Sequence, residues 1–232
     1  MNTVFLWGFS CLVVIVILIV LKRRRDIALL KTVTALHRGT VSEQELVLKL
    51  LRYGIPPSAI FHDLYVQKSR SAYSQIDVVA VTPVGIIVFE VKEYSGSIYG
   101  NGCQSYWTQV LAHSKQKYSF YNPIMQNNSH IEALKTKLAP FADVPLYSVI
   151  VFYGKCVFRD IRSVPEGVFL LKSYNVFKVI DTILKNNPDV NKASLEATVE
   201  VLQNAVQNGD CAEIRAKHIE NINYISDRNS MF

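Results

Sequence analysis

The chain has 232 residues, 50% of them hydrophobic, and its 25 basic and 19 acidic residues give a formal net charge of +6. Four of the basic residues form the cluster Lys22–Arg25, so only about +2 is left for the rest, and global charge does not indicate a polyanionic ligand. The four cysteines have no paired spacing and are interpreted as free thiols rather than as disulfides or zinc ligands.

An uncharged apolar run over residues 3–21 predicts a transmembrane helix. At roughly 1.5 Å per residue the run can cross a hydrocarbon core of about 30 Å. The basic cluster that follows is typical of a cytoplasmic flank, so we expect a single-pass protein with its N-terminus outside and its domain in the cytoplasm. A cleaved signal peptide is the main alternative, but its basic start, shorter apolar core and small-residue cleavage site are missing. A helix packed inside a soluble protein is the other, and the basic cluster counts against it.

Two helices are predicted next. The first continues from the apolar run over residues 26–36 and ends before Gly39. The second begins at Ser42 as N-cap, with Glu45 three residues later as the capping-box partner. Its apolar positions are Leu46, Val47, Leu50 and Leu51.

The middle of the chain contains short β-branched runs. Residues 61–67 alternate as a strand does, and the runs 75–82 and 86–91 flank Pro83-Val84-Gly85, which predicts a hairpin. Asn122-Pro123 indicates the N-cap and first residue of a helix that extends to about residue 138. Further strands are expected at residues 96–99, 106–111, 146–153 and 168–171, and further helices at 175–184, 192–207 and 213–225.

This order of elements predicts an α/β domain with a mixed central sheet flanked by helices. About 200 residues after the apolar run suffice for one domain with a substantial core. We therefore divide the chain into a membrane anchor with its basic flank (1–25), a juxtamembrane helix (26–38), the α/β domain (39–186) and a C-terminal helical extension (187–232).

The hairpin carries two acidic residues among apolar ones. If the turn is centred on Pro83 and Val84, paired residue numbers sum to about 167, which places Asp77 opposite Glu90 and puts Lys92 on the same face. Both faces are otherwise apolar, as expected of central strands. A register shift of one residue would move Asp77 to the face opposite Glu90.

Two facing carboxylates repel each other unless a positive charge lies between them. A divalent cation such as Mg²⁺ or Mn²⁺, bound by Asp77 and Glu90, would provide it, and Lys92 could orient or activate a metal-bound water. Glu43 projects from the apolar face of its helix as a possible third carboxylate, although an acidic residue in a first turn also favours the helix dipole. A purely structural network of Lys92, Glu90 and Asp77 is the alternative.

Taken together, these residues resemble the nuclease-related domain family, which is similar to the PD-(D/E)XK nucleases with their restriction-endonuclease-like fold. The resemblance rests on an ordered set of motifs, namely Gln75-Ile76-Asp77, the run from Gly85 to Lys92, Tyr94-Ser95-Gly96, the run from Tyr106 to Gln109, and the run from Asn122 to Asn127 with His130. It departs from the family pattern at Val78, where the family usually has His, and at Ser42, where it usually has Gly.

The resemblance implies that Asp77 and Glu90 bind a metal ion, that Lys92 is the motif lysine, and that Glu43 is the acidic residue of the first core helix. Four further family positions are possible substrate-binding residues: Gln75, Trp107, Gln109 and Gln126. The simpler interpretations are a surface amide for Gln126, a core indole for Trp107 and a packed or solvated side chain for His130.

The sequence thus predicts a membrane-anchored cytoplasmic nuclease that hydrolyses nucleic-acid phosphodiesters with Mg²⁺ or Mn²⁺, with DNA favoured over RNA. Its partners would be the lipid bilayer and nucleic acid. The alternative is a non-catalytic binding or scaffold module with a nuclease fold, tethered to the membrane, because fold alone does not establish activity.

Overall fold

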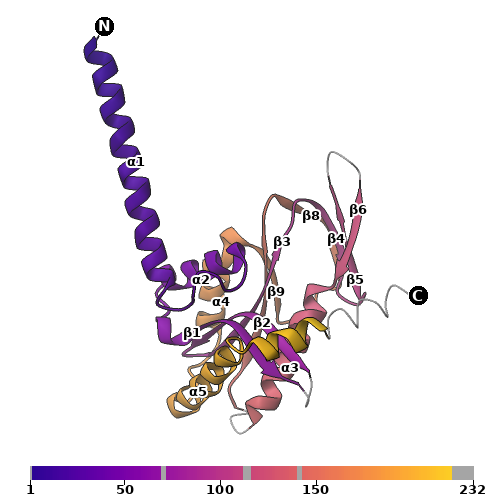
Figure 1. Cartoon of the computed structure of the whole chain (residues 1–232). Coiled ribbons are helices and arrows are strands. Elements are labelled where there is room, and N and C mark those ends of the chain that lie inside the picture. Colours follow the sequence, from indigo (N-terminus) through magenta and orange to yellow (C-terminus); the bar gives the residue numbers. More distant parts are fainter. Residues whose placement is uncertain (1, 69–71, 112–115, 140–142, 221–232) are drawn as a thin grey trace.

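The computed structural model describes residues 2–68, 72–111, 116–139 and 143–220, with side chains from residue 12 onward (Figure 1). Helix α1 (Asn2–Leu30) projects from the rest of the molecule, and the apolar side chains Leu12–Leu21 along it are exposed. Among the residues described in this way, no helix is both long and apolar enough to cross a membrane. Residues 3–11 of the expected span lie outside the described side chains.

The two N-terminal helices differ from the sequence prediction at their boundaries. Helix α1 ends at Leu30, and turns replace the helix that was expected to reach residue 36. The β-branched run Thr32–Thr34 explains the early end, because such residues lose side-chain freedom in a helix. Helix α2 (Val41–Tyr53) begins two residues earlier than predicted, since Thr40 and not Ser42 is its N-cap.

The capping box predicted for α2 is therefore wrong. The Thr40 hydroxyl accepts a hydrogen bond from the Glu43 N–H, which satisfies a free donor of the first turn. Ser42 instead donates to the Glu93 carboxylate, and Glu45 forms an ion pair with Lys49 one turn later. The cap shift makes Glu43, rather than Glu45, the third residue of the helix.

A mixed five-stranded sheet forms the centre of the fold, in the order β1-β2-β3-β7-β9. After the short 3-10 helix η1 (Pro57–Ala59), its strands are β1 (Ile60–Gln67), β2 (Tyr73–Thr82), β3 (Gly85–Glu93), β7 (Leu146–Tyr153) and β9 (Val168–Lys172). The first three are antiparallel, whereas β7 and β9 run parallel to β3. This confirms the predicted mixed α/β class.

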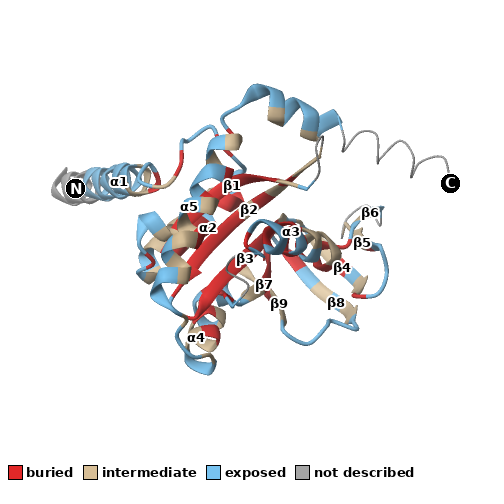
Figure 2. Cartoon of the chain, turned by 90° about the horizontal axis from the view of Figure 1, so that it is seen from below, coloured by how far each residue is buried: buried red, intermediate tan, exposed pale blue. Residues whose placement is uncertain are grey.

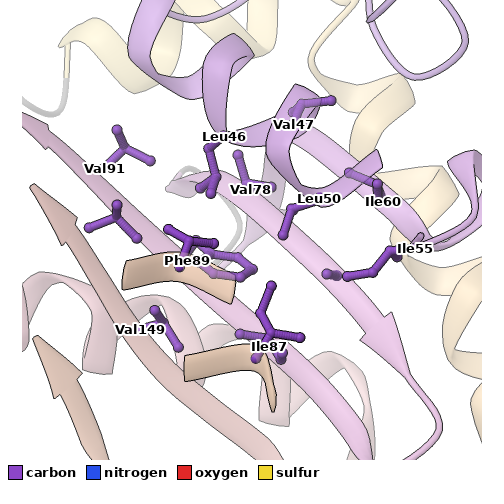
Figure 3. Close-up of a cluster of buried hydrophobic side chains, with 14 of the residues drawn as sticks. Leu46, Val47, Leu50, Ile55, Ile60, Val78, Ile87, Phe89, Val91 and Val149 are labelled. Carbon is purple, nitrogen blue, oxygen red and sulfur yellow. The ribbon is translucent and has the colours of Figure 1, made fainter. Parts of the chain in front are cut away.

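Helices cover both faces of this sheet, and the strands between them are buried (Figure 2). On one face lie α2 and α4 (Val176–Asn186), preceded by the 3-10 helix η3 (Ser173–Asn175). Leu46, Val47 and Leu50 of α2 pack there on Val78 and Phe89 (Figure 3). The other face holds α3 (Pro123–Lys137) and α5 (Lys192–Asn208), whose apolar side chains pack on the same strands from behind.

The predicted hairpin register is confirmed, because β2 pairs with β3 from Thr82–Gly85 to Val78–Phe89. The predicted faces hold from residue 78 onward, but Ile76 lies in the same apolar cluster as Val79 rather than with Val78. The neighbouring Asp63 of β1 has a φ of 56°, in the left-handed region. We attribute the break in alternation to this local twist of the β1–β2 pair.

A second sheet has the order β6-β5-β4-β8. Its strands are β4 (Gly96–Asn101), β5 (Tyr106–Val110), β6 (Lys117–Tyr121) and β8 (Cys156–Arg162), of which β6 and β8 were not predicted. Strand β4 follows β3, and β8 follows β7, after two residues in each case. At one of these connections Gly154 has a φ of 74°, and a Cβ there would lie 2.3 Å from the Tyr94 carbonyl oxygen. The parallel strands of the first sheet thus continue directly into the second.

Beyond α5, residues 212–220 are helical, which agrees with the start of the predicted helix 213–225. Residues 221–225 of that helix lie outside the described residues.

Candidate active site

The candidate site lies where strands β2 and β3 separate. Their backbone pairing reaches Val78–Phe89, and at the next position the Asp77 carboxylate accepts a hydrogen bond from the Val91 N–H at 2.7 Å. The side chain of Asp77 therefore takes the place of a backbone acceptor. This hydrogen bond fixes the half-buried Asp77 carboxylate against β3, at the residue that follows Glu90 in the strand.

Glu90 is fully buried and is held from two sides. Its Oε1 lies 2.6 Å from the Lys92 Nζ, and its Oε2 lies 3.1 Å from the His130 Nε2 of helix α3. The Lys92 contact is an ion pair without hydrogen-bond geometry, which leaves Oε1 a buried oxygen with no hydrogen bond. Lys92 also donates to the Gln126 Oε1 at 3.0 Å, and the His130 Nδ1 lies 2.6 Å from the Ser74 hydroxyl. Strands β2 and β3 and helix α3 are thereby joined through Glu90.

Glu43 is buried in the first turn of α2 within a second polar network. Its Oε1 accepts a hydrogen bond from the Thr40 hydroxyl at 2.8 Å, and its Oε2 lies 3.2 Å from the His62 Nε2. The other ring nitrogen of His62 lies 2.8 Å from the Thr34 hydroxyl. The segment between α1 and α2 thus contacts Glu43 directly and through His62.

The three carboxyl groups influence one another electrostatically. Burial raises the pKa of Asp77 well above its ordinary value, and the negative charges of Glu90 and Glu43 raise it further. For Glu90, burial acts in the same direction, but Lys92 and His130 outweigh it and lower the pKa. Burial would lower the pKa of Lys92, yet the charges of Glu90 and Asp77 raise it. Burial and the neighbouring carboxylates therefore disfavour ionisation of Asp77, whereas Lys92 and His130 favour ionisation of Glu90.

The four further family positions lie in different surroundings. Gln126 contacts Lys92, so it is more than the surface amide of the simpler interpretation. Trp107 is a core indole that stacks on Phe152 and donates to a backbone carbonyl. Gln109 donates to the Ser95 carbonyl, and the amide of Gln75 donates to Asp63 rather than toward Asp77. Of these four, Gln126 is the one whose side chain contacts the Lys92–Glu90 pair.

Sequence reasoning named His130 in the family motif but gave it no role in the site, and it did not name His62. His130 was interpreted as packed or solvated, although its place one turn after Gln126 on α3 was a usable signal. His62 lies in an apolar strand without any local motif, and only the packing of α2 on β1 brings it to Glu43.

The oxygen donors fit a hard divalent cation. No group of three or more His, Cys, Asp or Glu side chains in the described part of the chain is arranged to hold a metal ion. However, the Asp77 carboxyl group and the Glu90 Oε1 without a hydrogen bond are hard donors of the kind that Mg²⁺ and Mn²⁺ prefer. The ammonium group of Lys92 already shows that a positive charge is accommodated against Glu90.

Comparison with known proteins gives one family and one curated relative. The family described as the nuclease-related domain matches residues 38–153, a range that contains all the site residues from Glu43 to His130. An uncharacterized protein of Bacillus anthracis is 30% identical over 140 residues, which cover 60% of this chain and 64% of that protein. The match thus spans just under two thirds of the relative's length. No solved structure matches the chain.

Proposed function

The chain belongs to the nuclease-related domain family, and from this premise we propose that it hydrolyses nucleic-acid phosphodiesters with a divalent metal ion, in a domain of restriction-endonuclease-like fold tethered to a membrane. The observation that carries the proposal is that Asp77 is held against β3 by the Val91 N–H, beside the Glu90–Lys92 ion pair whose charges act on it. Glu43 contributes a third negative charge that acts on Asp77.

In this proposal Asp77 and Glu90 hold Mg²⁺ or Mn²⁺. The ion would supply charge neutralisation at the phosphate and a water nucleophile that is reactive at neutral pH. Lys92, positioned by Gln126, keeps a positive charge where a phosphate oxygen or the attacking water would lie. His130 holds Glu90 in one orientation, and Glu43 of α2 would assist the binding of the metal ion or the water. DNA is the expected substrate.

Two isosteric substitutions test this function. Asp77→Asn and Glu90→Gln each remove a carboxylate charge while keeping size, so we expect either to abolish Mg²⁺-dependent cleavage of labelled single-stranded and double-stranded DNA. Glu45→Gln, on the exposed side of α2, serves as the control and should cleave like the wild type. Equal cleavage by all three purified proteins would rule out the proposed site.

One observation favours the non-catalytic alternative. Glu90 is already neutralised by Lys92 and contacted by His130, so the network is stable as an ion pair without a cation. A binding module would need nothing more. Titration calorimetry separates the two functions. A nuclease must bind Mg²⁺ or Mn²⁺, and the heat of binding should be lost in Asp77→Asn, whereas a scaffold need bind neither ion.

We also propose that α1 anchors the domain in a membrane, with the N-terminus outside and the domain in the cytoplasm. The exposed apolar side chains Leu12–Leu21 and the exposed basic cluster Lys22–Arg25 support this arrangement. The full chain should remain in the membrane fraction after alkaline carbonate washing, and removal of residues 2–21 should release it. Release of the full chain by carbonate would refute the anchor.

A further inference from the structure

The second sheet presents an aromatic outer face. Strand pairing places Tyr106 opposite Tyr121, and Tyr99 opposite Thr108, so that the three tyrosines lie on one side of the sheet. Tyr99 is 40% exposed, and Tyr106 and Tyr121 are each 46% exposed. On the other side of the sheet, Trp107 and Ile98 are buried in the core. The rings of Tyr106 and Tyr121 meet edge to face at 6.0 Å. A patch of exposed aromatic side chains of this kind marks a candidate binding surface.

A pocket lies on the same face. Its volume is about 240 Å³, and both Tyr99 and Tyr106 line it together with polar side chains, among them Gln104, Thr108 and the ion pair of Arg162 with Asp160. The pocket thus combines ring faces with hydrogen-bond donors and acceptors. This combination suits a flat, polar ring with a charged neighbour, as in a nucleotide.

The net positive charge of the domain is concentrated in this sheet. Its strands and the loops within residues 96–121 and 156–162 hold four basic residues and one acidic residue. Apart from the cluster Lys22–Arg25, the rest of the chain holds 17 basic and 18 acidic residues. The excess of basic over acidic residues outside the cluster Lys22–Arg25 is therefore local to this sheet, and it is complementary to a polyanion.

Strand β3, which carries Glu90 and Lys92, leads directly into β4 of the second sheet. Strand β4 begins two residues after β3, and the Tyr94 ring between them packs on Phe120 of β6 at a centroid distance of 4.4 Å. Burial raises the pKa of the Tyr94 phenol, and the charges of Lys92 and Glu90 also act on that pKa. At about 3.3 Å per residue, Tyr99 lies at most about 23 Å from Lys92 along the chain.

We propose that the outer face of the second sheet binds a single-stranded segment of nucleic acid, whose bases stack on Tyr99, Tyr106 and Tyr121 and whose phosphates contact Lys117 and Arg162. Stacking needs bases that are free of a duplex, and it tolerates any sequence because every base has a π-face. This surface would guide the substrate into the cleavage site, and in that respect the inference rests on the proposed function. The net charge favours nucleic acid over a protein partner, for which exposed tyrosines alone would also be suitable.

Fluorescence anisotropy with the full chain in detergent micelles tests the inference. The probes are a labelled 20-nucleotide DNA strand, the RNA strand of the same sequence and the corresponding duplex, measured without metal in the Asp77→Asn protein so that nothing is cleaved. We expect Tyr99→Ala and Tyr106→Ala each to weaken single-strand binding roughly tenfold, and duplex binding much less. Tyr99→Phe and Tyr106→Phe keep the ring and should bind nearly as the parent does.

Tyr174→Ala is the matched control, because Tyr174 is 76% exposed but lies outside the second sheet. The cluster Lys22–Arg25 also attracts nucleic acid, but that contribution falls with added salt, whereas the ratio between the alanine and phenylalanine variants should persist. Single-strand binding that is unchanged in the folded alanine variants, or equally weakened by Tyr174→Ala, would overturn the inference, as would loss of binding in the phenylalanine variants. So would equal losses for single strands and duplex.

The two proposals fail in different ways. If the alanine variants lose binding but the wild type cleaves no substrate with metal, the surface stands and the hydrolase does not. If the wild type cleaves and the alanine variants bind normally, the hydrolase stands and the surface is refuted.

Discussion

Asp77 is held where its own charge is unfavourable. Burial and the neighbouring charges of Glu90 and Glu43 raise its pKa in the folded protein above the ordinary value of about 3.9 that applies to the unfolded chain. Between these two values the folded state binds a proton that the unfolded state has lost. The stability contributed by Asp77 is therefore present at low pH and is lost as pH rises from about 4 through the folded pKa.

Asp77→Asn should consequently stabilise the metal-free protein at neutral pH, by on the order of 1–3 kcal/mol, while it abolishes cleavage. The Asn side-chain oxygen can still accept the hydrogen bond from Val91, and the amide carries no charge to bury. Urea unfolding in the presence of a chelator, at pH values from about 3 to 8, should show the advantage of the variant growing with pH. A variant that is less stable than the wild type at pH 7 would contradict this account.

How far the site could be foreseen differs between its residues. The placement of Asp77 beside Glu90 and Lys92 could be predicted from the hairpin, because a short turn fixes the register of both strands. The contacts of Glu90 with His130 and of Glu43 with His62 depend on where α3 and α2 pack on the sheet. No local pattern encodes that packing. The motif positions Trp107 and Gln126 illustrate the same limit, since one is a core indole and the other contacts Lys92.

At the scale of elements, the start of α2 positions Glu43. The sequence predicted the helix but not its cap, since Thr40 and Ser42 are both acceptable N-cap residues and the choice depends on the tertiary contact of Ser42 with Glu93. Gly39, one residue before the cap, has a φ of 63°. A Cβ there would lie 2.4 Å from both the Glu43 Oε2 and the His62 Nε2.

Gly39→Ala should therefore destabilise the protein by more than backbone strain alone, about 2–4 kcal/mol, and should lower cleavage by displacing Glu43. Gly54→Ala is the matched control, because Gly54 also has a positive φ of 109° but a Cβ there meets nothing within 4 Å. We expect that control to lose about 1 kcal/mol and to keep its activity. Thermal unfolding and a cleavage assay provide the comparison, and equal losses in both variants would show that the Glu43–His62 contact does not depend on this glycine.

The second sheet was predicted only in part. Strands β4 and β5 were expected, but β6 is a polar, tyrosine-rich segment with three exposed residues at its start. Strand β8 is a short stretch with two arginines in which Cys156 is the one buried residue. Neither segment has the apolar run that is typical of a core strand. Each forms because a neighbouring strand already offers hydrogen-bonding groups, β5 for β6 and β4 for β8.

At the scale of the whole molecule, one buried arginine joins three distant parts of the chain. Arg38, just after the segment that leaves α1, contacts Asp63 of β1 at 3.2 Å and Asp210, beyond the end of α5, at 3.0 Å. It also donates to the carbonyl oxygens of Asp63 and Val206. The family match ends at residue 153, yet this contact and the buried Leu202 connect α5 to the α/β core.

Arg38→Ala should cost about 3–5 kcal/mol in free energy of unfolding, because it leaves the buried carboxylate of Asp63 without its positively charged partner. Arg52→Ala is the matched control. Its ion pair with Asp26 is partly exposed, with 42% of the Arg52 side chain accessible, so we expect a loss of about 1 kcal/mol or less. Urea unfolding of the full chain in detergent measures both. Limited proteolysis adds a second measure, since loss of the Arg38 contacts should expose α5 to cleavage before the central sheet. If Arg38→Ala is no less stable than Arg52→Ala and α5 stays protected, packing of apolar side chains such as Leu202 suffices to hold the helix.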